Sequence, residues 1–246
     1  MPNPDALAIQ LYTVRRELAD DLDGTLAALA DIGFRQLEAF DLLAFADRLH
    51  EPVRRLGLAV PSAHVDVLAS DPAAVVGAAH DLGVATVVQP WTDPSRWRDE
   101  ASIAELAGAL SEKARDLASD GLRVGYHNHH FELASQVGGR HALEVFAERL
   151  DPSVVLEVDA YWAFAGGADV PALLRTLGDR VVALHVKDGD GSLDTSRQVP
   201  AGQGVVPIPA ILAAAPRALP IVELDDTAGD MLDAVRAGFT YLAGLG

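Results

Sequence analysis

Apolar runs and segments with helical spacing alternate along the whole chain. Runs such as "VATVVQPW" (84–91) and "RVVALHVKD" (180–188) are largely apolar, which is typical of parallel strands that are covered on both faces. Between such runs, apolar residues recur at the spacing of an amphipathic helix, as in "EASIAELAGALSEKARDLASDG" (100–121). Several of these helical segments close on glycine, a common stop signal of a helix. The pattern predicts a repeated strand–helix unit.

Eight such units cover the chain. The predicted strands are 7–14, 34–40, 58–65, 84–91, 122–129, 153–160, 180–188 and 219–226, and the predicted helices are 23–33, 42–57, 71–83, 100–121, 139–151, 169–179, 208–215 and 229–242. Eight strands that alternate with helices in 246 residues match a (β/α)₈ TIM barrel, and we expect a single domain over 1–246. A doubly wound open sheet is the alternative, but it often has a glycine-rich first turn, which "QLYTVRREL" lacks.

Composition narrows the class of protein and its partners. The chain is 50% hydrophobic but has no apolar run long enough to span a membrane, and its first residues lack the features of a signal peptide. Cysteine is absent, which excludes disulfides and thiolate chemistry, and we expect a cytoplasmic protein. The formal net charge of −17 disfavours nucleic acid as a partner. A small-molecule partner is expected, and a homo-oligomer is compatible with the sequence.

A polar or aromatic side chain lies at the end of every predicted strand. In a TIM barrel the chemistry is found at these carboxyl-terminal ends. Alternate residues share a face of a strand, so His127 and His129 should point together, while His130 belongs to the loop. The residues at the strand ends are Gln10, Tyr12, Glu38, His64, Gln89, Trp91, His127, His129, Glu157, Asp159, His185, Lys187 and Glu223.

Four residues of metal-binding type end four consecutive predicted strands: His127, Asp159, His185 and Glu223. Charged side chains are seldom buried unless they are paired or bind a metal, and here they would meet in one barrel mouth. We therefore predict one divalent metal ion held by these four residues. Imidazole and carboxylate ligands suit transition metals better than Ca²⁺, so Mn²⁺ is favoured, with Zn²⁺, Co²⁺, Mg²⁺ or Fe²⁺ as alternatives.

The other strand-end residues are candidates for contacts with a substrate. Aromatic residues of this set could equally pack at the rim of the barrel, and a single histidine such as His64 is as often a hydrogen-bonded core residue. Glu38 and Glu157 could serve to balance buried polar groups through ion pairs. The predicted substrate contacts are Tyr12, Glu38, His64, Gln89, Trp91, His129 and Trp162.

Six motifs follow one another along the chain: "IQLYTVR", "GYHNHHFEL", "LEVDAYWAFAGGADV", "VVALHVKDGDG", "GQGVV" and "IVELD". Together and in this order, they resemble the motifs of the xylose isomerase-like sugar phosphate isomerase/epimerase family. The resemblance implies a TIM barrel that binds one divalent metal through Glu, Asp, His and Glu on strands five to eight. Asp159, His185 and Glu223 match that set directly.

Two departures from the family pattern bear on mechanism. His127 stands where many family epimerases have a glutamate, so a mechanism with two metal-bound glutamates lacks one partner. His127 could be a ligand, a second base or both, and Glu132 in the following loop could supply the missing carboxylate. Trp162 stands where related barrels often have histidine, which makes that wall more apolar. Trp162 and the acidic pI of about 4.6 also argue against the endonuclease branch with its trinuclear zinc site.

The resemblance implies proton transfer next to a carbonyl group through an enediolate. Glu223, His127, Glu132 and Lys187 are the catalytic candidates, with Lys187 pairing with a substrate oxygen or, alternatively, with a barrel carboxylate such as Glu157. We expect a sugar isomerase or epimerase. A dehydratase of the keto-inositol (inosose) type is the second reading, because it shares the first step. An alternative from a different functional class is a non-catalytic sugar-binding barrel, or a subunit whose partner completes the site.

Overall fold

A closed barrel of parallel strands forms the centre of the molecule. The structure, a computed structural model, describes residues 7–245. In that part of the chain the strands close in the order β1-β10-β9-β8-β5-β4-β3-β2, with every neighbouring pair parallel. They are β1 (Ala8–Gln10), β2 (Gln36–Ala39), β3 (Ala59–His64), β4 (Thr86–Gln89), β5 (Arg123–His127), β8 (Val155–Asp159), β9 (Val181–Val186) and β10 (Leu219–Val222). The predicted (β/α)₈ TIM barrel is confirmed.

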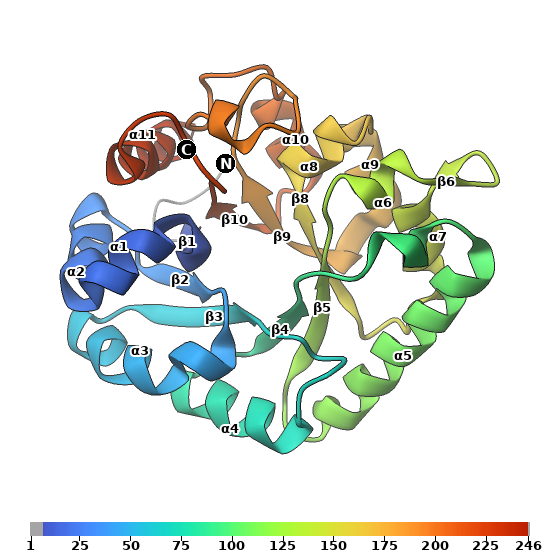
Figure 1. The fold of residues 1–246 in the computed structure, drawn as a ribbon, viewed down its shortest axis with the longest axis horizontal. Coiled ribbons are helices and arrows are strands. Elements are labelled where there is room, and N and C mark those ends of the chain that lie inside the picture. Colours follow the sequence, from blue (N-terminus) through green and yellow to red (C-terminus); the bar gives the residue numbers. More distant parts are fainter. Residues whose placement is uncertain (1–6, 246) are drawn as a thin grey trace.

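Helices surround the strands as an outer ring (Figure 1). None of the described helices is long and apolar enough to cross a membrane. The α-helices are α1 (Arg15–Asp20), α2 (Leu22–Ile32), α3 (Leu42–Leu56), α4 (Pro72–Leu82), α5 (Glu100–Ala118), α6 (Phe131–Ala134), α7 (Ala142–Arg149), α8 (Ala160–Ala165), α9 (Val170–Leu177), α10 (Ile208–Ala214) and α11 (Met231–Gly244). Short 3₁₀ helices are η2 (Leu11–Val14), η3 (Pro94–Trp97), η4 (Gly178–Arg180) and η5 (Thr195–Arg197).

Helix α4 illustrates how the sequence sets the helix ends. The Asp71 side chain accepts a hydrogen bond from the Ala73 backbone N–H, and Pro72 occupies the first turn, where its missing N–H costs nothing. The helix stops at Gly83, whose φ of 72° is readily adopted only by glycine. Such signals set where each helix begins and ends. Because all the strands of the barrel are parallel, their carboxyl-terminal ends lie on the same side of the molecule.

The first predicted strand, 7–14, is shorter than expected. The Gln10 side chain accepts a hydrogen bond from the Tyr12 backbone N–H at 3.1 Å, and the chain turns there into η2 and then α1. An apolar run that continues from a strand into a 3₁₀ helix shows no break in its periodicity. Gln10 therefore ends the strand, and Tyr12 stands beyond it on the rim.

Two segments near the middle of the chain also differ from expectation. Asp159 Oδ1 accepts from the Trp162 N–H at 2.8 Å and starts α8 directly after β8, where no helix was predicted. The two-stranded hairpin of β6 (Gln136–Val137) and β7 (Arg140–His141) replaces the start of the predicted helix 139–151. Both differences arise from local hydrogen bonds that apolar periodicity does not register.

The long loop after β9 is held by one buried carboxylate. Asp188 Oδ1 accepts from the backbone N–H groups of Gly189 and Val206, both at 2.9 Å, and Oδ2 accepts from Gly202 at 3.1 Å. Gly204 lies so close that a Cβ there would stand 2.3 Å from Asp188 Oδ1. The loop is thereby fixed at both of its ends around Asp188, next to the strand end that carries Lys187.

Candidate active site

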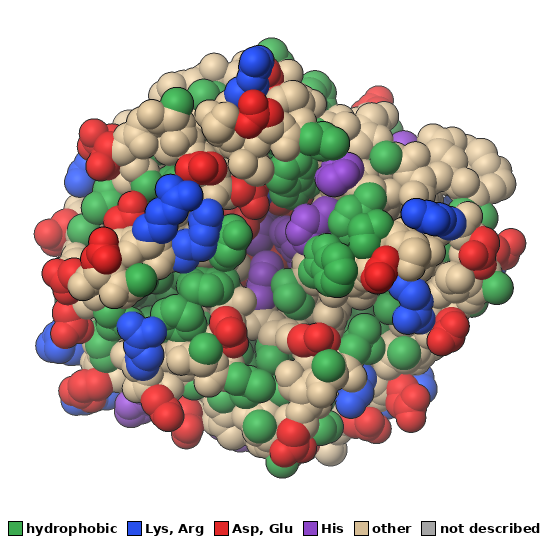
Figure 2. Space-filling model, in the orientation of Figure 1, with side chains coloured by type: hydrophobic (Ala, Val, Ile, Leu, Met, Phe, Trp, Pro, Cys, Tyr) green, Lys and Arg blue, Asp and Glu red, His purple; other side chains and the backbone are tan. Residues whose placement is uncertain are grey.

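Histidines gather in the hollow at the centre of the barrel (Figure 2). His64, His127 and His185 are each no more than 6% exposed and come from β3, β5 and β9. Their rings lie within 4.6 to 5.6 Å of one another, centroid to centroid. The carboxylates between and around these rings decide what the arrangement can bind.

One carboxylate oxygen, Glu157 Oε1, stands among all three imidazoles. It lies 2.7 Å from His64 Nε2, 3.1 Å from His127 Nδ1 and 3.1 Å from His185 Nε2. His185 Nε2 also lies 2.7 Å from Glu38 Oε1. Histidines that bind a metal usually donate their other ring N–H to a carboxylate or a carbonyl. Glu157 and Glu38 have the position of such supporting partners for His127 and His185.

Glu38 is completely buried and held from two sides. Gln10 Nε2 donates to its Oε1 at 2.8 Å, and the Ser62 hydroxyl donates to its Oε2. Burial and the nearby charge of Glu157 raise the pKa of Glu38 to about 7. Its predicted substrate contact is untested, but its partners in the structure are barrel side chains.

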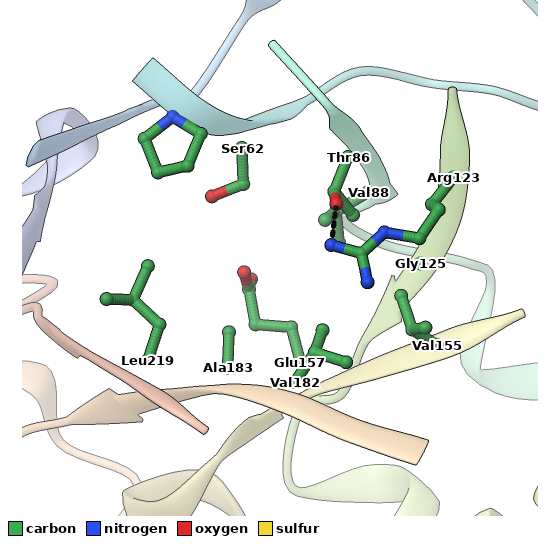
Figure 3. Close-up of a pocket in the computed structure, with 11 residues that line it drawn as sticks. Ser62, Thr86, Val88, Arg123, Gly125, Val155, Glu157, Val182, Ala183 and Leu219 are labelled. Carbon is green, nitrogen blue, oxygen red and sulfur yellow. Dashed lines mark hydrogen bonds between the residues drawn. The ribbon is translucent and has the colours of Figure 1, made fainter. Parts of the chain in front are cut away.

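A small cavity lies on the other side of Glu157, towards the amino-terminal ends of the strands. It has a volume of about 120 Å³, and Glu157 and Ser62 point into it (Figure 3). Glu157 Oε2 is buried and has no hydrogen-bond partner within the protein. The cavity is large enough for several waters, which could give this oxygen its hydrogen bonds. Glu157 therefore separates the barrel mouth from this cavity.

A second group, formed by Asp159, His185 and Glu223, has the properties of a metal site. One ligand atom from each lies within 4.8 Å of the others. His185 Nδ1 is buried without a hydrogen-bond partner, although it lies 3.0 Å from Glu223 Oε2. His127 Nε2 faces the same group, 3.9 Å from Asp159 Oδ2. The structure thus brings the four predicted ligands together.

The two metal-type groups differ in how their atoms are satisfied. In the group of His64, His127, Glu157 and His185, each nitrogen near the centre already faces a carboxylate oxygen. In the Asp159 group, His185 Nδ1 makes an ion-pair contact with Glu223 but no hydrogen bond, and the Asp159 carboxylate faces the same pair. Buried polar atoms almost always make a hydrogen bond, so the lack of one at His185 Nδ1 favours the Asp159 group as the ion site.

Lys187 lies in the middle of that group. Its Nζ is 2.7 Å from Asp159 Oδ2 and 3.0 Å from Asp225 Oδ2, and it also bonds to Glu223 Oε2. The suggested pairing with Glu157 is not formed, because Glu157 is occupied by the histidines. Asp225 was not predicted from the sequence, although it shares strand parity with Glu223, and that signal could have identified it.

The charges of these groups follow from burial and from one another. Against the effect of burial, the surrounding carboxylates, Asp159 first, raise the pKa of Lys187 well above its usual value. Burial raises the pKa of Asp159 to about 7, although Lys187 opposes the shift. Burial and the nearby His185 lower the pKa of His127 well below its usual value, so its imidazole is neutral. A neutral imidazole is the form that binds a metal.

A divalent cation fits the donor set and the charge of this site. Asp159, Glu223 and Asp225 carry three negative charges when ionised, and Lys187 balances one of them. Against the effect of burial, Glu157 and Glu223 raise the pKa of His185 well above its usual value, so this imidazole must release a proton when an ion binds. The remaining two negative charges then match one divalent ion. Imidazole nitrogen with carboxylate oxygen is a common ligand set for Zn²⁺ and Mn²⁺. The ammonium of Lys187 must move before an ion can contact the carboxylate oxygens that it now occupies.

His129 and Trp162 line the mouth beside Lys187. Burial and the charge of Lys187 lower the pKa of His129 to about 4, and its buried Nδ1 has no hydrogen-bond partner. The Trp162 ring centroid lies 5.4 Å from Lys187 Nζ, within the range of a cation–π contact. His130 packs against Trp162 from the loop, as its parity suggested. Both predicted substrate contacts lie at the mouth.

Tyr12, Gln89 and Trp91 occupy the rim. Tyr12 is 37% exposed and Trp91 is 50% exposed. Gln89 is buried and connects two loops, because its Oε1 accepts from Leu68 N–H at 3.1 Å and its Nε2 donates to the Trp91 carbonyl at 2.8 Å. The Trp91 ring is available to a ligand, whereas the Arg15 guanidinium lies 4.0 Å from the Tyr12 ring centroid and the Gln89 amide already has loop partners.

Glu132 lies behind the mouth, at the start of α6. Its Oε1 accepts from the Tyr126 hydroxyl at 2.8 Å, and its Oε2 accepts from the His129 backbone N–H at 2.9 Å. Tyr126 in turn contacts Thr92, whose hydroxyl accepts from the Trp97 indole N–H. The proposal that Glu132 supplies a missing catalytic carboxylate stays untested, but these contacts favour a role in fixing the His129 loop.

Glu132→Gln should make the protein more stable at alkaline pH. Burial raises the pKa of Glu132 to about 8, above its value in an unfolded chain. Its stabilising contribution is therefore complete at low pH and declines as the pH rises towards about 8. One pKa unit corresponds to about 1.4 kcal/mol, so wild type should lose at least about 2 kcal/mol relative to the variant between about pH 5 and about pH 9.

Urea unfolding of both proteins across that pH range measures the difference. Glutamine can keep both contacts, with its oxygen on the His129 N–H and its amide donating to the Tyr126 oxygen. Glu112→Gln on the exposed face of α5 is the control and should follow wild type. If the free energies of unfolding of wild type and Glu132→Gln changed in parallel with pH, the pKa of Glu132 would not be raised in the folded protein.

The closed parallel barrel of this chain is the fold of a known class of proteins. The family model described as "Xylose isomerase-like TIM barrel" matches residues 26–218. The chain belongs to this family. No protein with a curated description matches the chain.

Several solved structures share the fold of this chain. A sugar phosphate isomerase/epimerase from Parabacteroides distasonis ATCC 8503 is 22% identical, with a TM-score of 0.81 over 99% of this chain and 98% of that chain. The IOLI protein with a bound zinc atom is 15% identical, with a TM-score of 0.69 over 97% of each chain. An L-ribulose 3-epimerase is 16% identical, with a TM-score of 0.67 over 97% of this chain and 93% of that chain. At these identities the likeness shows the fold.

Proposed function

We propose that the protein is a metal-dependent isomerase or epimerase of a sugar or keto-sugar that moves a proton next to a carbonyl group. The observation that carries this proposal is the buried group of Asp159, His185 and Glu223 with Lys187 at the carboxyl-terminal end of the barrel. Catalytic groups of TIM barrels lie at this end. The structural relatives include an isomerase/epimerase and an epimerase, which supports the same reaction class.

His127, Asp159, His185 and Glu223 would hold the divalent ion, and Mn²⁺ and Zn²⁺ both suit this donor set. A protein of the same fold carries zinc. When bound, the ion would act as a Lewis acid that stabilises negative charge on the substrate's oxygens. Glu157 and Glu38 orient the imidazoles through their other ring nitrogens, so the ligand atoms face the mouth.

Glu223 and Lys187 are the groups that would act on the substrate. The Glu223 carboxylate accepts the proton from the carbon next to the carbonyl group. Against the effect of burial, His185 and Lys187 lower the pKa of Glu223 well below its usual value, so the carboxylate is ionised. The Lys187 ammonium donates a hydrogen bond to the oxygen that gains charge. His127 is the candidate for a second base on the other side of the substrate.

His129 and Trp162 would bind and orient the substrate. The unpaired Nδ1 of the neutral His129 ring can hydrogen-bond a substrate hydroxyl, which would give this buried atom its missing partner. Trp162 offers an apolar face beside Lys187. Neutral groups of this kind suit a polyhydroxylated substrate without phosphate. An unphosphorylated sugar, keto-sugar or inositol is therefore the proposed substrate class.

Incubation with the right keto-sugar in D₂O should place deuterium next to its carbonyl group. Proton abstraction is the first step of isomerisation, of epimerisation and of dehydration, so exchange reports the step that all three share. NMR of a panel of keto-sugars and inosose, with Mn²⁺ added, measures it. A matched sample treated with a chelator and left without added metal is the control and should exchange at the background rate.

The product distinguishes the remaining readings. Deuterium in a new aldose, ketose or epimer supports the proposal, whereas release of water from inosose would identify the dehydratase reading. Saturable binding of a sugar without proton exchange at any pH would instead indicate a non-catalytic sugar-binding barrel. Exchange at the same rate without metal would contradict the role of the ion.

A further inference from the structure

Lys187 occupies the same carboxylate oxygens that an ion would need. Its Nζ contacts Asp159 Oδ2 and Glu223 Oε2, and both residues belong to the group whose ligand atoms lie within 4.8 Å. The side chain of Lys187 has no solvent exposure, so water screens its charge poorly. Two cations that close to the same oxygens repel each other strongly. An ion and the ammonium therefore cannot share the position that Lys187 now holds.

Asp225 gives the ammonium a partner outside the ligand group. Its Oδ2 lies 3.0 Å from Lys187 Nζ and accepts a hydrogen bond from Gln198 Nε2 at 2.8 Å. The Asp225 backbone N–H donates to Gln198 Oε1 at 2.7 Å, and Gln198 is completely buried. This reciprocal pair fixes the Asp225 carboxylate without help from Asp159 or Glu223. Asp225 is thus ready to hold a cation whatever happens at the ligand group.

We propose that a divalent ion and the Lys187 ammonium compete for Asp159 and Glu223, and that Asp225 retains the ammonium when the ion displaces it. The inference rests on the metal site of the proposed function. Without the ion, Lys187 keeps Asp159, Glu223 and Asp225 from repelling one another. When the ion binds, Lys187 gives up two of its three carboxylates and keeps the third. The exchange leaves both the ion and an ammonium in the mouth, where the proposed function uses both.

The lysine content of the chain gives a direct readout of this displacement. Lys113 and Lys187 are the only lysines in the sequence. Protein labelled with ¹³C at lysine Cε should give two lysine signals, of which Lys113 on α5 serves as the internal reference. One equivalent of Zn²⁺, which is diamagnetic, should shift the Lys187 signal and leave the Lys113 signal in place. An unmoved Lys187 signal with Zn²⁺ bound would overturn the proposal.

Calorimetric titration of Zn²⁺ into variants measures the competition itself. Lys187→Met removes the competing cation and should tighten Zn²⁺ binding by at least about tenfold. Lys113→Met is the matched control and should bind as wild type does. If Lys187→Met binds Zn²⁺ no more tightly than wild type, the ammonium does not compete.

Asp225→Asn tests the retaining carboxylate and keeps Lys187 in place, which matters if Lys187→Met folds poorly with three unpaired carboxylates. Without Asp225, an ammonium that leaves Asp159 and Glu223 has no other carboxylate to contact. Its displacement therefore costs more free energy, and Zn²⁺ should bind more weakly. Asp226→Asn removes a neighbouring charge that pairs with Arg16 and controls for the general loss of negative charge. Equal affinities for these two variants would overturn the role of Asp225. If wild type binds no Zn²⁺, the metal site and the competition both fail, while exchange in D₂O still tests proton transfer.

Discussion

Replacing Asp159 or His185 with alanine should abolish stoichiometric binding of a divalent metal. Asp159 and His185 each supply one atom of the group that also contains Glu223, and His185 Nδ1 lies 3.0 Å from Glu223 Oε2 without a hydrogen bond. Loss of a residue that merely supports a ligand typically weakens metal binding about 10- to 100-fold, so loss of a ligand should cost at least about a hundredfold. Elemental analysis after loading with Mn²⁺ and gel filtration measures the content.

Two further variants make this result interpretable. Asp159 also caps α8 through the Trp162 N–H, so Asp159→Asn, which can keep a cap, separates loss of the metal from loss of the helix. His80→Ala on the exposed surface of α4 is the matched histidine control and should retain the wild-type metal content. Wild-type metal content in both Asp159→Ala and His185→Ala would show that the ion binds elsewhere.

Glu223→Gln should lose at least about a hundredfold in the rate of proton exchange, which is the usual scale for a missing general base. The amide cannot accept the proton from carbon, although its oxygen can still accept the hydrogen bond from Lys187. Because glutamine retains an oxygen ligand, the variant should bind some metal, so the loss of rate would exceed the loss of bound ion. Deuterium incorporation at saturating Mn²⁺ measures the effect.

The size of the loss in Glu223→Gln locates the base. Glu112→Gln on the surface of α5 carries the same change away from the mouth and should exchange at the wild-type rate. Near-normal exchange by Glu223→Gln would move the base to His127 or Glu132. Of these, His127 faces the ligand group through Nε2, whereas Glu132 is bonded to Tyr126 and to the His129 backbone.

The barrel and the meeting of its strand ends were predictable from periodicity alone. Buried parallel strands have nearly continuous apolar runs, and a closed barrel brings their carboxyl-terminal ends to one mouth. The same reasoning predicts that Asp159, His185 and Glu223 lie together, as they do in the structure. Membership of the family and the fold are confirmed, while the roles of the individual residues stay predictions.

The partners within the mouth were less predictable, because they depend on three-dimensional contacts between distant strands. Parity placed Lys187 beside His185 on the predicted strand but could not show that the histidines would occupy Glu157 and leave Lys187 to Asp159. The position of Glu132 depends on the direction of the four-residue helix α6, for which a periodic pattern carries little information.

The loop after β9 separates two kinds of evolutionary change. Asp188 holds the backbone of this loop through three amide N–H groups, and two of them belong to Gly189 and Gly202, where a Cβ would meet a tyrosine ring. The segment between its anchors includes exposed residues such as Leu193 and Val205. Substitutions there can alter the rim without disturbing the strand that carries His185. Substitutions between the anchors of this loop therefore allow substrate preference to change during evolution, while the strands of the barrel and the residues at their ends stay the same.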